Sequence, residues 1–225
     1  MSGRPAIRRI ASLASLLLAA TALAGCDDGS YGRREAWRDV KERQCVASGE
    51  VRATSYIKPA RKIREKGACG MNQPYRISMI DAGNVDLSSE VVIGCSMIPA
   101  MELWLRQSVQ PNAFAMLGTV VAEVETLGTY NCRTRNNRRG AKLSEHAFGN
   151  AIDVAAFRLA DGRVISVLDD WHAGTDESRF LREVHRGACA TFTTTIGPDG
   201  DRHHADHFHV DLARHDANGT YRYCR

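Results

Sequence analysis

Two potential metal ligands, a histidine and an aspartate, are carried by the segment Ser144-Glu145-His146-Ala147-Phe148-Gly149-Asn150-Ala151-Ile152-Asp153. His146 and Asp153 are seven residues apart, so a single helical face cannot be assumed to present both. Gly149 lies between them, and a turn there, followed by a strand that begins near Ile152, would bring the two side chains together. The segment therefore predicts half of a metal site where a turn enters a strand.

A second segment, rich in histidine, lies nearer the C-terminus: His203-His204-Ala205-Asp206-His207-Phe208-His209-Val210-Asp211. Residues two apart in a strand project from the same face, so His207 and His209 would point together, with the residues between and after them facing the core. Either histidine would join His146 and Asp153 in a His₂Asp set, and three protein ligands with an open position are typical of catalytic zinc. The alternative for the His-x-His pair is a solvated histidine-rich loop.

Hydrophobic periodicity predicts a mixed fold around these segments. It favours helices over residues 96–109 and 177–186, a strand over residues 120–125, a hairpin over residues 152–167 and a last strand over residues 207–212. We expect the first helix to end before Pro111 and the second near Gly187. Strands and helices in this scattered order indicate an α+β fold, in which helices flank a small antiparallel sheet that carries the zinc site.

The N-terminus is organised like an export signal. Three arginines among the first nine residues precede an apolar run from Ile10 to Ala24, which is shorter than the roughly 20 residues needed to span a bilayer. The run closes in Leu23-Ala24-Gly25-Cys26, which resembles a bacterial lipobox and implies a periplasmic protein anchored to a membrane through lipid on Cys26. Asp27 favours the inner membrane. The alternative is a plain signal peptide with an incidental cysteine.

Charge and hydropathy define the remaining organisation. The 225 residues carry a formal net charge of +4, and three of the positive charges lie in residues 1–25, which contain no acid. The rest is therefore near neutral, which argues against a nucleic-acid partner. Residues 26–44 are polar, and we interpret them as a lipid anchor and tether, with at most a frayed helix from Arg34. Residues 45–225 contain no repeat or low-complexity break and are interpreted as one domain.

Cysteine usage agrees with export. Six cysteines remain once Cys26 is assigned to the lipid, and an even number in an oxidising compartment predicts up to three disulfides. The candidates are Cys45, Cys69, Cys95, Cys132, Cys189 and Cys224. None of them forms a Cys-x-x-Cys pair, which argues against a thiolate zinc site or a redox pair. Spacing alone leaves their pairing open.

The first segment also carries a family signature. Ser144-x-His146-x-x-Gly149-x-Ala151-x-Asp153 matches the fixed positions of a motif of D-Ala-D-Ala metallopeptidases, a superfamily that includes lysostaphin-type endopeptidases and the hedgehog signalling domain. Its second signature, a later His-x-His, is met by His207 and His209. More closely, the chain resembles the bacterial extensin-like C-terminal domain family. This resemblance runs from Cys69-Gly70 through Leu127–Arg133 and Ser144–Arg163 to His207–Asp211, which is nearly the whole domain.

The resemblance implies roles for individual residues. His146, Asp153 and His209 would be zinc ligands, and His207 would lie beside the metal to transfer a proton or stabilise an oxyanion. Arg133 would help to hold the substrate carbonyl or carboxylate, and its alternative is a surface charge near a disulfide. No glutamate lies close before the third ligand to act as general base. His207, alone or assisted by Asp206, would therefore be the base, or activity would be weak or absent.

Two functions from different classes follow from the resemblance. The first is a zinc-dependent peptidase of the cell envelope that hydrolyses D,D-type peptide bonds in the stems or cross-links of peptidoglycan. The second is a non-catalytic module that holds zinc and binds wall peptides or a partner protein without cleaving them. The intact set of three ligands together with His207 favours the enzyme. The sequence identifies no regulatory protein partner.

Overall fold

The structure of the chain is a computed structural model that describes Met1 and residues 32–225. Apart from Met1, the predicted signal peptide lies outside the described residues, and so do Cys26 and Asp27. Within the described part, no helix has the length and apolar character needed to cross a membrane.

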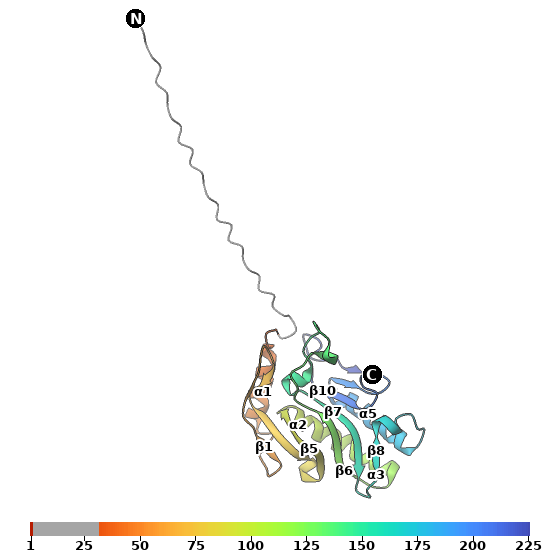
Figure 1. Cartoon of the computed structure of the whole chain (residues 1–225). Helices are drawn as coiled ribbons and strands as arrows, with labels where there is room; N and C mark the ends of the chain where they lie inside the picture. The colour runs from red at the N-terminus through yellow and green to blue at the C-terminus, as the bar shows by residue number, and fades with distance from the viewer. Residues whose placement is uncertain (2–31) are drawn as a thin grey trace.

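Nine strands form one sheet in the order β1-β4-β5-β6-β7-β10-β9-β11, with β8 also paired to β7 (Figure 1). They are β1 Ile57–Pro59, β4 Pro74–Ile80, β5 Val85–Gly94, β6 Val121–Gly128, β7 Ala151–Leu159, β8 Val164–Ser166, β9 Thr194–Ile196, β10 Phe208–Asp211 and β11 Tyr223–Cys224. Neighbouring strands are antiparallel except in the pairs β5–β6 and β9–β11. A separate two-stranded sheet joins β2 Ile63–Arg64 to β3 Gly70–Met71. A mixed fold of helices and strands is confirmed, but the expectation of a small antiparallel sheet is wrong.

The sheet is larger than expected because several strands leave no recognisable pattern in the sequence. β1 and β9 have three residues each and β11 has two, which is too short for alternation to be seen. β4 and β5 pair as a long hairpin, but their register shifts between Ile77 and Met79, which interrupts the period of two. The hairpin expected over residues 152–167 is present as β7 and β8, and the last expected strand is β10.

The helices lie along the sheet and supply much of the core. They are α1 Ala36–Ser48, α2 Met97–Trp104, the π turn η3 Leu105–Val109, α3 Gln110–Leu117, α4 Val167–Asp170 and α5 Asp176–Thr191, with short 3-10 turns η2 Asp81–Gly83, η4 Arg135–Asn137 and η5 Glu145–Phe148. Trp104 of α2 is fully buried, and its indole N–H donates to the Val184 carbonyl of α5 at 2.9 Å. Its ring makes edge contacts with Phe157 of β7 and with Phe192. These contacts fix α2 and α5 against the sheet.

Both predicted helices extend beyond their expected ends. α2 continues through the π turn η3 into α3, whose last residue is Leu117 and whose left-handed cap is Gly118. Pro111 lies directly after the π turn, which changes the hydrogen-bond pattern there, and it does not end the helix. α5 runs past Gly187 to Thr191. Gly187 serves close packing rather than termination, since a Cβ there would overlap the side chain of Ser108 in η3.

The N-terminal helix α1 differs most from expectation. Residues 36–44 were expected to belong to a polar tether, but they form the first part of α1 and pack on the domain. Arg38 and Glu42 are buried, and Cys45 at its C-terminal end is bonded to Cys95. The polar sequence has no apolar stripe because the buried face of α1 makes ion pairs instead of hydrophobic contacts.

The three predicted disulfides are confirmed, and the structure supplies the pairing that spacing left open. Cys45 pairs with Cys95, Cys69 with Cys132 and Cys189 with Cys224. Their Cα–Cα distances are 6.0, 5.7 and 5.5 Å, which are ordinary for disulfides.

Candidate metal centre

The first half of the candidate site lies where the turn η5 enters the strand β7. Ser144 caps this turn, and its Oγ accepts a hydrogen bond from the His146 amide at 3.4 Å. The turn ends at Gly149, whose φ of 60° is left-handed and where a Cβ would overlap the side chain of Met71. The chain then runs directly into β7, so that His146 Nε2 lies 3.2 Å from Asp153 Oδ1. The predicted turn and strand entry are both present.

The second half is supplied by β10, which pairs antiparallel with β7. His209 lies directly opposite Asp153 in this register. Phe208 and Val210 point to the other face and are fully buried, and the Phe208 ring contacts His185 of α5 with the ring centroids 5.3 Å apart. His209 therefore projects from the face of the sheet that is turned away from α5.

Three buried side chains bring one potential ligand atom each to a common point. His209 Nδ1 lies 2.9 Å from Asp153 Oδ1 and 3.2 Å from His146 Nε2, which is itself 3.2 Å from the same carboxylate oxygen. Tetrahedral bonds of about 2.0–2.1 Å to zinc leave ligand atoms roughly 3.3 Å apart, so the spacing is close to what a zinc site requires. We call these three side chains the ligand triangle.

The other ring nitrogen of each histidine is held by an acceptor. His146 Nδ1 lies 2.5 Å from the carbonyl oxygen of Thr129, and since a carbonyl can only accept, this nitrogen carries the hydrogen. His209 Nε2 donates in the same way to Asp211 Oδ2 at 3.0 Å. In the neutral rings, the lone pairs of His146 Nε2 and His209 Nδ1 are therefore directed at the triangle. Such outer contacts are typical of histidines that bind metals.

Two carboxylates set the electrostatics of the triangle. Burial lowers the pKa of His209, but hydrogen bonds and charge from Asp153 and Asp211 outweigh burial and raise this pKa to about 10. Burial raises the pKa of Asp153, but hydrogen bonds from His146 and His209 outweigh it and hold this pKa well below its ordinary value. The triangle therefore keeps an ionised carboxylate and stabilises a positive charge beside it, either a proton or a metal cation.

His207 lies beside the triangle. Its Nε2 is 3.6 Å from Asp153 Oδ1, while its Nδ1 donates to Asp206 Oδ1 at 2.7 Å. The contact with Asp206 fixes the tautomer and leaves Nε2 facing the triangle. The His207 side chain retains 13% exposure, so a substrate can reach it. Of the two histidines in His-x-His, the structure places His209 among the ligand atoms and His207 next to them.

Arg133 is separate from the triangle but borders the same pocket as His209. This pocket has a volume of about 300 Å³. Arg133 Nη1 lies 3.5 Å from the Thr134 carbonyl oxygen, and the side chain makes no ion pair with any described residue. The arrangement leaves its guanidinium available to a ligand in the pocket.

His204 is a neighbour of the site that the sequence reasoning missed. Its Nδ1 lies 2.8 Å from Asp201 Oδ1, and its ring centroid is 5.2 Å from that of His207 and 5.7 Å from that of His209. Burial lowers the pKa of His204, although the contact with Asp201 opposes this shift. The spacing of Asp201, His204 and His207, three residues each, was a visible signal. It lies in an irregular loop, where spacing does not reveal which rings converge.

A buried ion pair connects α1 to the turn that carries His146. Arg38 Nη1 and Nη2 donate to the two carboxylate oxygens of Glu145 at 2.6 and 2.7 Å, and the two side chains are 7% and 4% exposed. The Glu145 carboxylate also accepts from the side-chain Nδ2 of Asn150 at 2.7 Å. The Arg38 guanidinium lies 3.8 Å from the centre of the Phe148 ring. Both ends of η5 are therefore held by α1.

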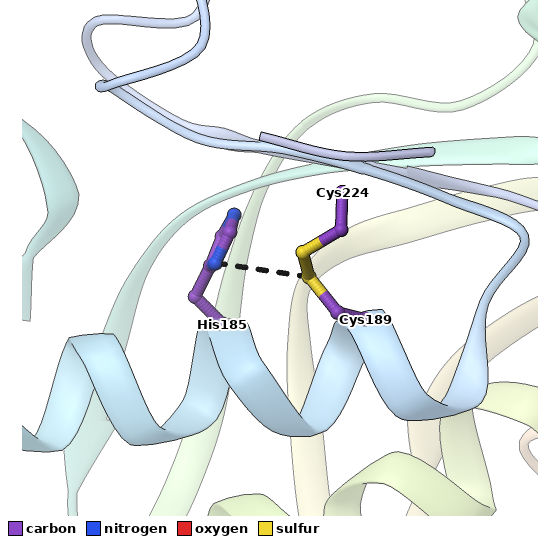
Figure 2. Close-up of side chains that lie close together, drawn as sticks. All are labelled: His185, Cys189 and Cys224. Carbon is purple, nitrogen blue, oxygen red and sulfur yellow. Dashed lines mark hydrogen bonds between the residues drawn. A yellow bond between two sulfur atoms is a disulfide. The ribbon is translucent and has the colours of Figure 1, made fainter. Parts of the chain in front are cut away.

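A second group of potential ligands, His185, Cys189 and Cys224, lies on the opposite side of the sheet. Figure 2 shows that the two sulfur atoms are bonded to each other and that the His185 ring faces them. His185 Nδ1 lies 3.9 Å from Cys189 Sγ. Sulfur atoms in a disulfide are not thiolates, so this group is a structural bridge beside a partly buried ring rather than a metal site.

Comparison with known proteins identifies the family. A family model described as "Extensin-like protein C-terminus" matches residues 43–225. The chain belongs to this extensin-like family. The extensin-like region contains the whole ligand triangle, the neighbouring His204 and His207, and all six paired cysteines. No curated protein and no solved structure matches the chain.

Proposed function

We propose that this extensin-like protein is a zinc peptidase of the cell envelope that hydrolyses D,D-type peptide bonds in the stems or cross-links of peptidoglycan. The observation that carries the proposal is the ligand triangle, with its three atoms 2.9–3.2 Å apart. The match of its motif to D-Ala-D-Ala metallopeptidases supports the reaction type and a place in the superfamily that includes lysostaphin-type endopeptidases and hedgehog.

The donor set fits zinc better than the other common divalent cations. Two imidazole nitrogens and one carboxylate are typical of open catalytic zinc sites, whereas magnesium and calcium prefer sets of oxygen atoms. The Thr129 carbonyl and the Asp211 carboxylate hold the histidines in the required tautomers. When bound by His146, Asp153 and His209, zinc supplies Lewis-acid chemistry that polarises the scissile carbonyl and acidifies water.

The side chains next to the triangle would handle protons and substrate. His207, oriented by Asp206, can accept a proton and deliver it to the leaving amine, and in its charged form it can stabilise an oxyanion. His204, oriented by Asp201, presents a second imidazole within the same group of rings. Arg133 borders the pocket and can hold a substrate carbonyl or carboxylate.

The proposed location follows from the N-terminus. A lipobox ending in Cys26 would give a periplasmic lipoprotein, and Asp27 favours retention at the inner membrane. The three disulfides support an oxidising compartment. A protein held there meets peptidoglycan peptides as its natural substrates.

Zinc content and peptide turnover, measured together on the same variants, test the proposal. His146→Ala, Asp153→Ala and His209→Ala should each lower zinc content in elemental analysis, because each removes one of three protein ligands. His207→Ala should keep its zinc but lose about 10²- to 10⁴-fold in the hydrolysis of cross-linked or pentapeptide muropeptides. His203→Ala is the matched control, because His203 is exposed in the same loop and should change neither measurement.

Two results would contradict the proposal in different ways. Loss of zinc from His207→Ala as complete as from His209→Ala would show that the ligand within His-x-His is misassigned. If the wild type binds stoichiometric zinc but shows no chelator-sensitive cleavage of any muropeptide, the protein is not the proposed enzyme. The alternative, a non-catalytic module that binds wall peptides or a partner protein, would then be favoured.

A further inference from the structure

Charge is distributed unevenly over the described part of the chain. Residues 61–66 and 134–142 together carry eight lysines or arginines and one acid, whereas the rest of residues 32–225 carries 19 lysines or arginines and 23 acids. All eight basic residues are exposed, and none of their side chains makes an ion pair or hydrogen bond within residues 32–225. We call them the basic face: Arg61, Lys62, Arg64, Lys66, Arg135, Arg138, Arg139 and Lys142. An otherwise acidic domain thus exposes positive charge that it does not neutralise.

The two basic segments lie side by side although about 70 residues separate them in the sequence. Cys69 follows the first segment and is bonded to Cys132, which precedes the second, with the two Cα atoms 5.7 Å apart. Both cysteines also belong to a small apolar cluster that is separate from the main core and contains Ala68, Ala147, Phe148 and Leu143. The eight cations therefore share one end of the domain.

The chain enters the domain beside the basic face. Arg34, which lies just before α1, donates from Nη1 to the Gly70 carbonyl at 2.6 Å. Gly70 begins β3, and β3 pairs with β2 in the first basic segment. Ala36, the first residue of α1, comes ten residues after Cys26, and a fully extended chain advances at most about 3.6 Å per residue. If Cys26 carries lipid, the start of α1 lies within roughly 35 Å of the membrane.

We propose that the basic face docks the domain on anionic phospholipid headgroups of the membrane to which the protein is anchored. The inference goes beyond hydrolysis and rests on the lipid anchor of the proposed function. The anchor keeps the domain near the membrane, and the charge of the basic face then determines which side of the domain meets the headgroups. Arg135 also borders the pocket beside the ligand triangle, so docking brings that pocket close to the membrane surface.

Trace acetylation of lysines, read by mass spectrometry, tests the inference on the native protein. The protein is reconstituted in vesicles of phosphatidylcholine, with or without anionic phosphatidylglycerol. Because a lipid anchor holds the protein on both kinds of vesicle, the comparison reports the basic face alone. Lys62, Lys66 and Lys142 should react about tenfold more slowly on the anionic vesicles, and this protection should disappear at about 1 M salt, where the screening length is about 3 Å.

A pair of double variants shows which charges are responsible. Each lysine or arginine near an anionic surface strengthens docking about fivefold, so Arg138→Gln/Arg139→Gln should weaken it about 25-fold and remove most of the protection. Arg179→Gln/Arg186→Gln is the matched control, because it removes two exposed arginines from α5, on the other side of the sheet. The control should preserve the protection of the wild type.

Several results would overturn the inference. They are equal acetylation on the two kinds of vesicle, protection that persists in 1 M salt, and an equal loss of protection in the two double variants. Protection by isolated peptidoglycan instead of anionic vesicles would assign the basic face to the wall and not to the membrane. A protein without lipid would stay in solution with neutral vesicles yet sediment with anionic ones, so failure of the anchor and failure of the basic face give different results.

Discussion

Arg38 shows how a residue outside the candidate metal centre can determine its geometry. Its guanidinium makes two hydrogen bonds to Glu145, the residue directly before the candidate ligand His146. Burial of both side chains means that neither charge can be solvated if the other is removed. The position of η5 therefore depends on an ion pair formed with a helix about a hundred residues earlier in the chain.

Replacement of Arg38 should consequently be costly. Arg38→Met keeps most of the side-chain volume but leaves Glu145 buried without its partner, so the free energy of unfolding should fall by about 3–5 kcal/mol. Urea denaturation measures this loss. The double variant Arg38→Met/Glu145→Gln should recover part of it, because the unpaired charge is removed.

Arg186→Met is the control for this prediction. Arg186 forms an exposed pair with Glu183 on α5, and its loss should change the free energy of unfolding by no more than about 1 kcal/mol. Equal losses in Arg38→Met and Arg186→Met would show that the buried pair has no special part in holding η5.

Some residues of the candidate site can be predicted from the sequence, whereas others cannot, for physical reasons. His146, Asp153 and the His207/His209 pair lie in short motifs, where spacing and strand alternation indicate which side chains can converge. Asp211 could be expected on the same strand face. Arg38 could not be predicted, because its ion pair joins segments that are far apart in the sequence. His204 could not be predicted, because it lies in an irregular loop that has no sequence period.

At the scale of the elements, tertiary packing overrides the local sequence signals that predict where a helix ends. Pro111 and Gly187 both lie where sequence rules predict that a helix ends, yet the chain remains helical through each. Pro111 is accommodated in the first turn after η3, and Gly187 allows α5 to approach Ser108 closely. Helices that pack against each other in the core gain more from burial than these residues cost locally.

His185 makes the stability of α5 sensitive to pH. Burial lowers the pKa of His185, and this outweighs its hydrogen bond to the Arg225 carbonyl and the attraction of Asp199. Because the unfolded chain takes up a proton more readily than the fold, the neutral ring stabilises the protein above the ordinary pKa of about 6.5. This contribution is lost as the pH falls through that value.

Urea denaturation at a series of pH values tests this effect. Between about pH 7.5 and 5, the free energy of unfolding of the wild type should fall more steeply than that of His185→Gln, which can still donate to Arg225 but does not titrate. His172→Gln is a suitable control, since the His172 side chain is 70% exposed. Identical slopes for wild type and His185→Gln would contradict the assignment of the pH dependence to the partly buried His185 ring.

At the scale of the whole molecule, the proposed lipid anchor determines where the domain can act. If Cys26 is lipidated, the native protein should partition into the detergent phase in a phase-separation assay, and Cys26→Ser should remain unprocessed or appear in the aqueous phase. Native mature protein in the aqueous phase would remove the lipoprotein assignment. The candidate metal centre does not depend on this result, because its residues lie in the extensin-like region.

The three disulfides are arranged differently along the chain. The span from Cys45 to Cys95 overlaps the span from Cys69 to Cys132, whereas Cys189 and Cys224 close a separate span. During biosynthesis the chain emerges N-terminus first, and among the six paired cysteines the next to follow Cys45 is Cys69, which is not its native partner. A bridge between these two would have to be exchanged before the native pairs could form. We therefore expect the first two bridges to form faster with a disulfide isomerase, whereas the C-terminal bridge joins consecutive cysteines and should not depend on one.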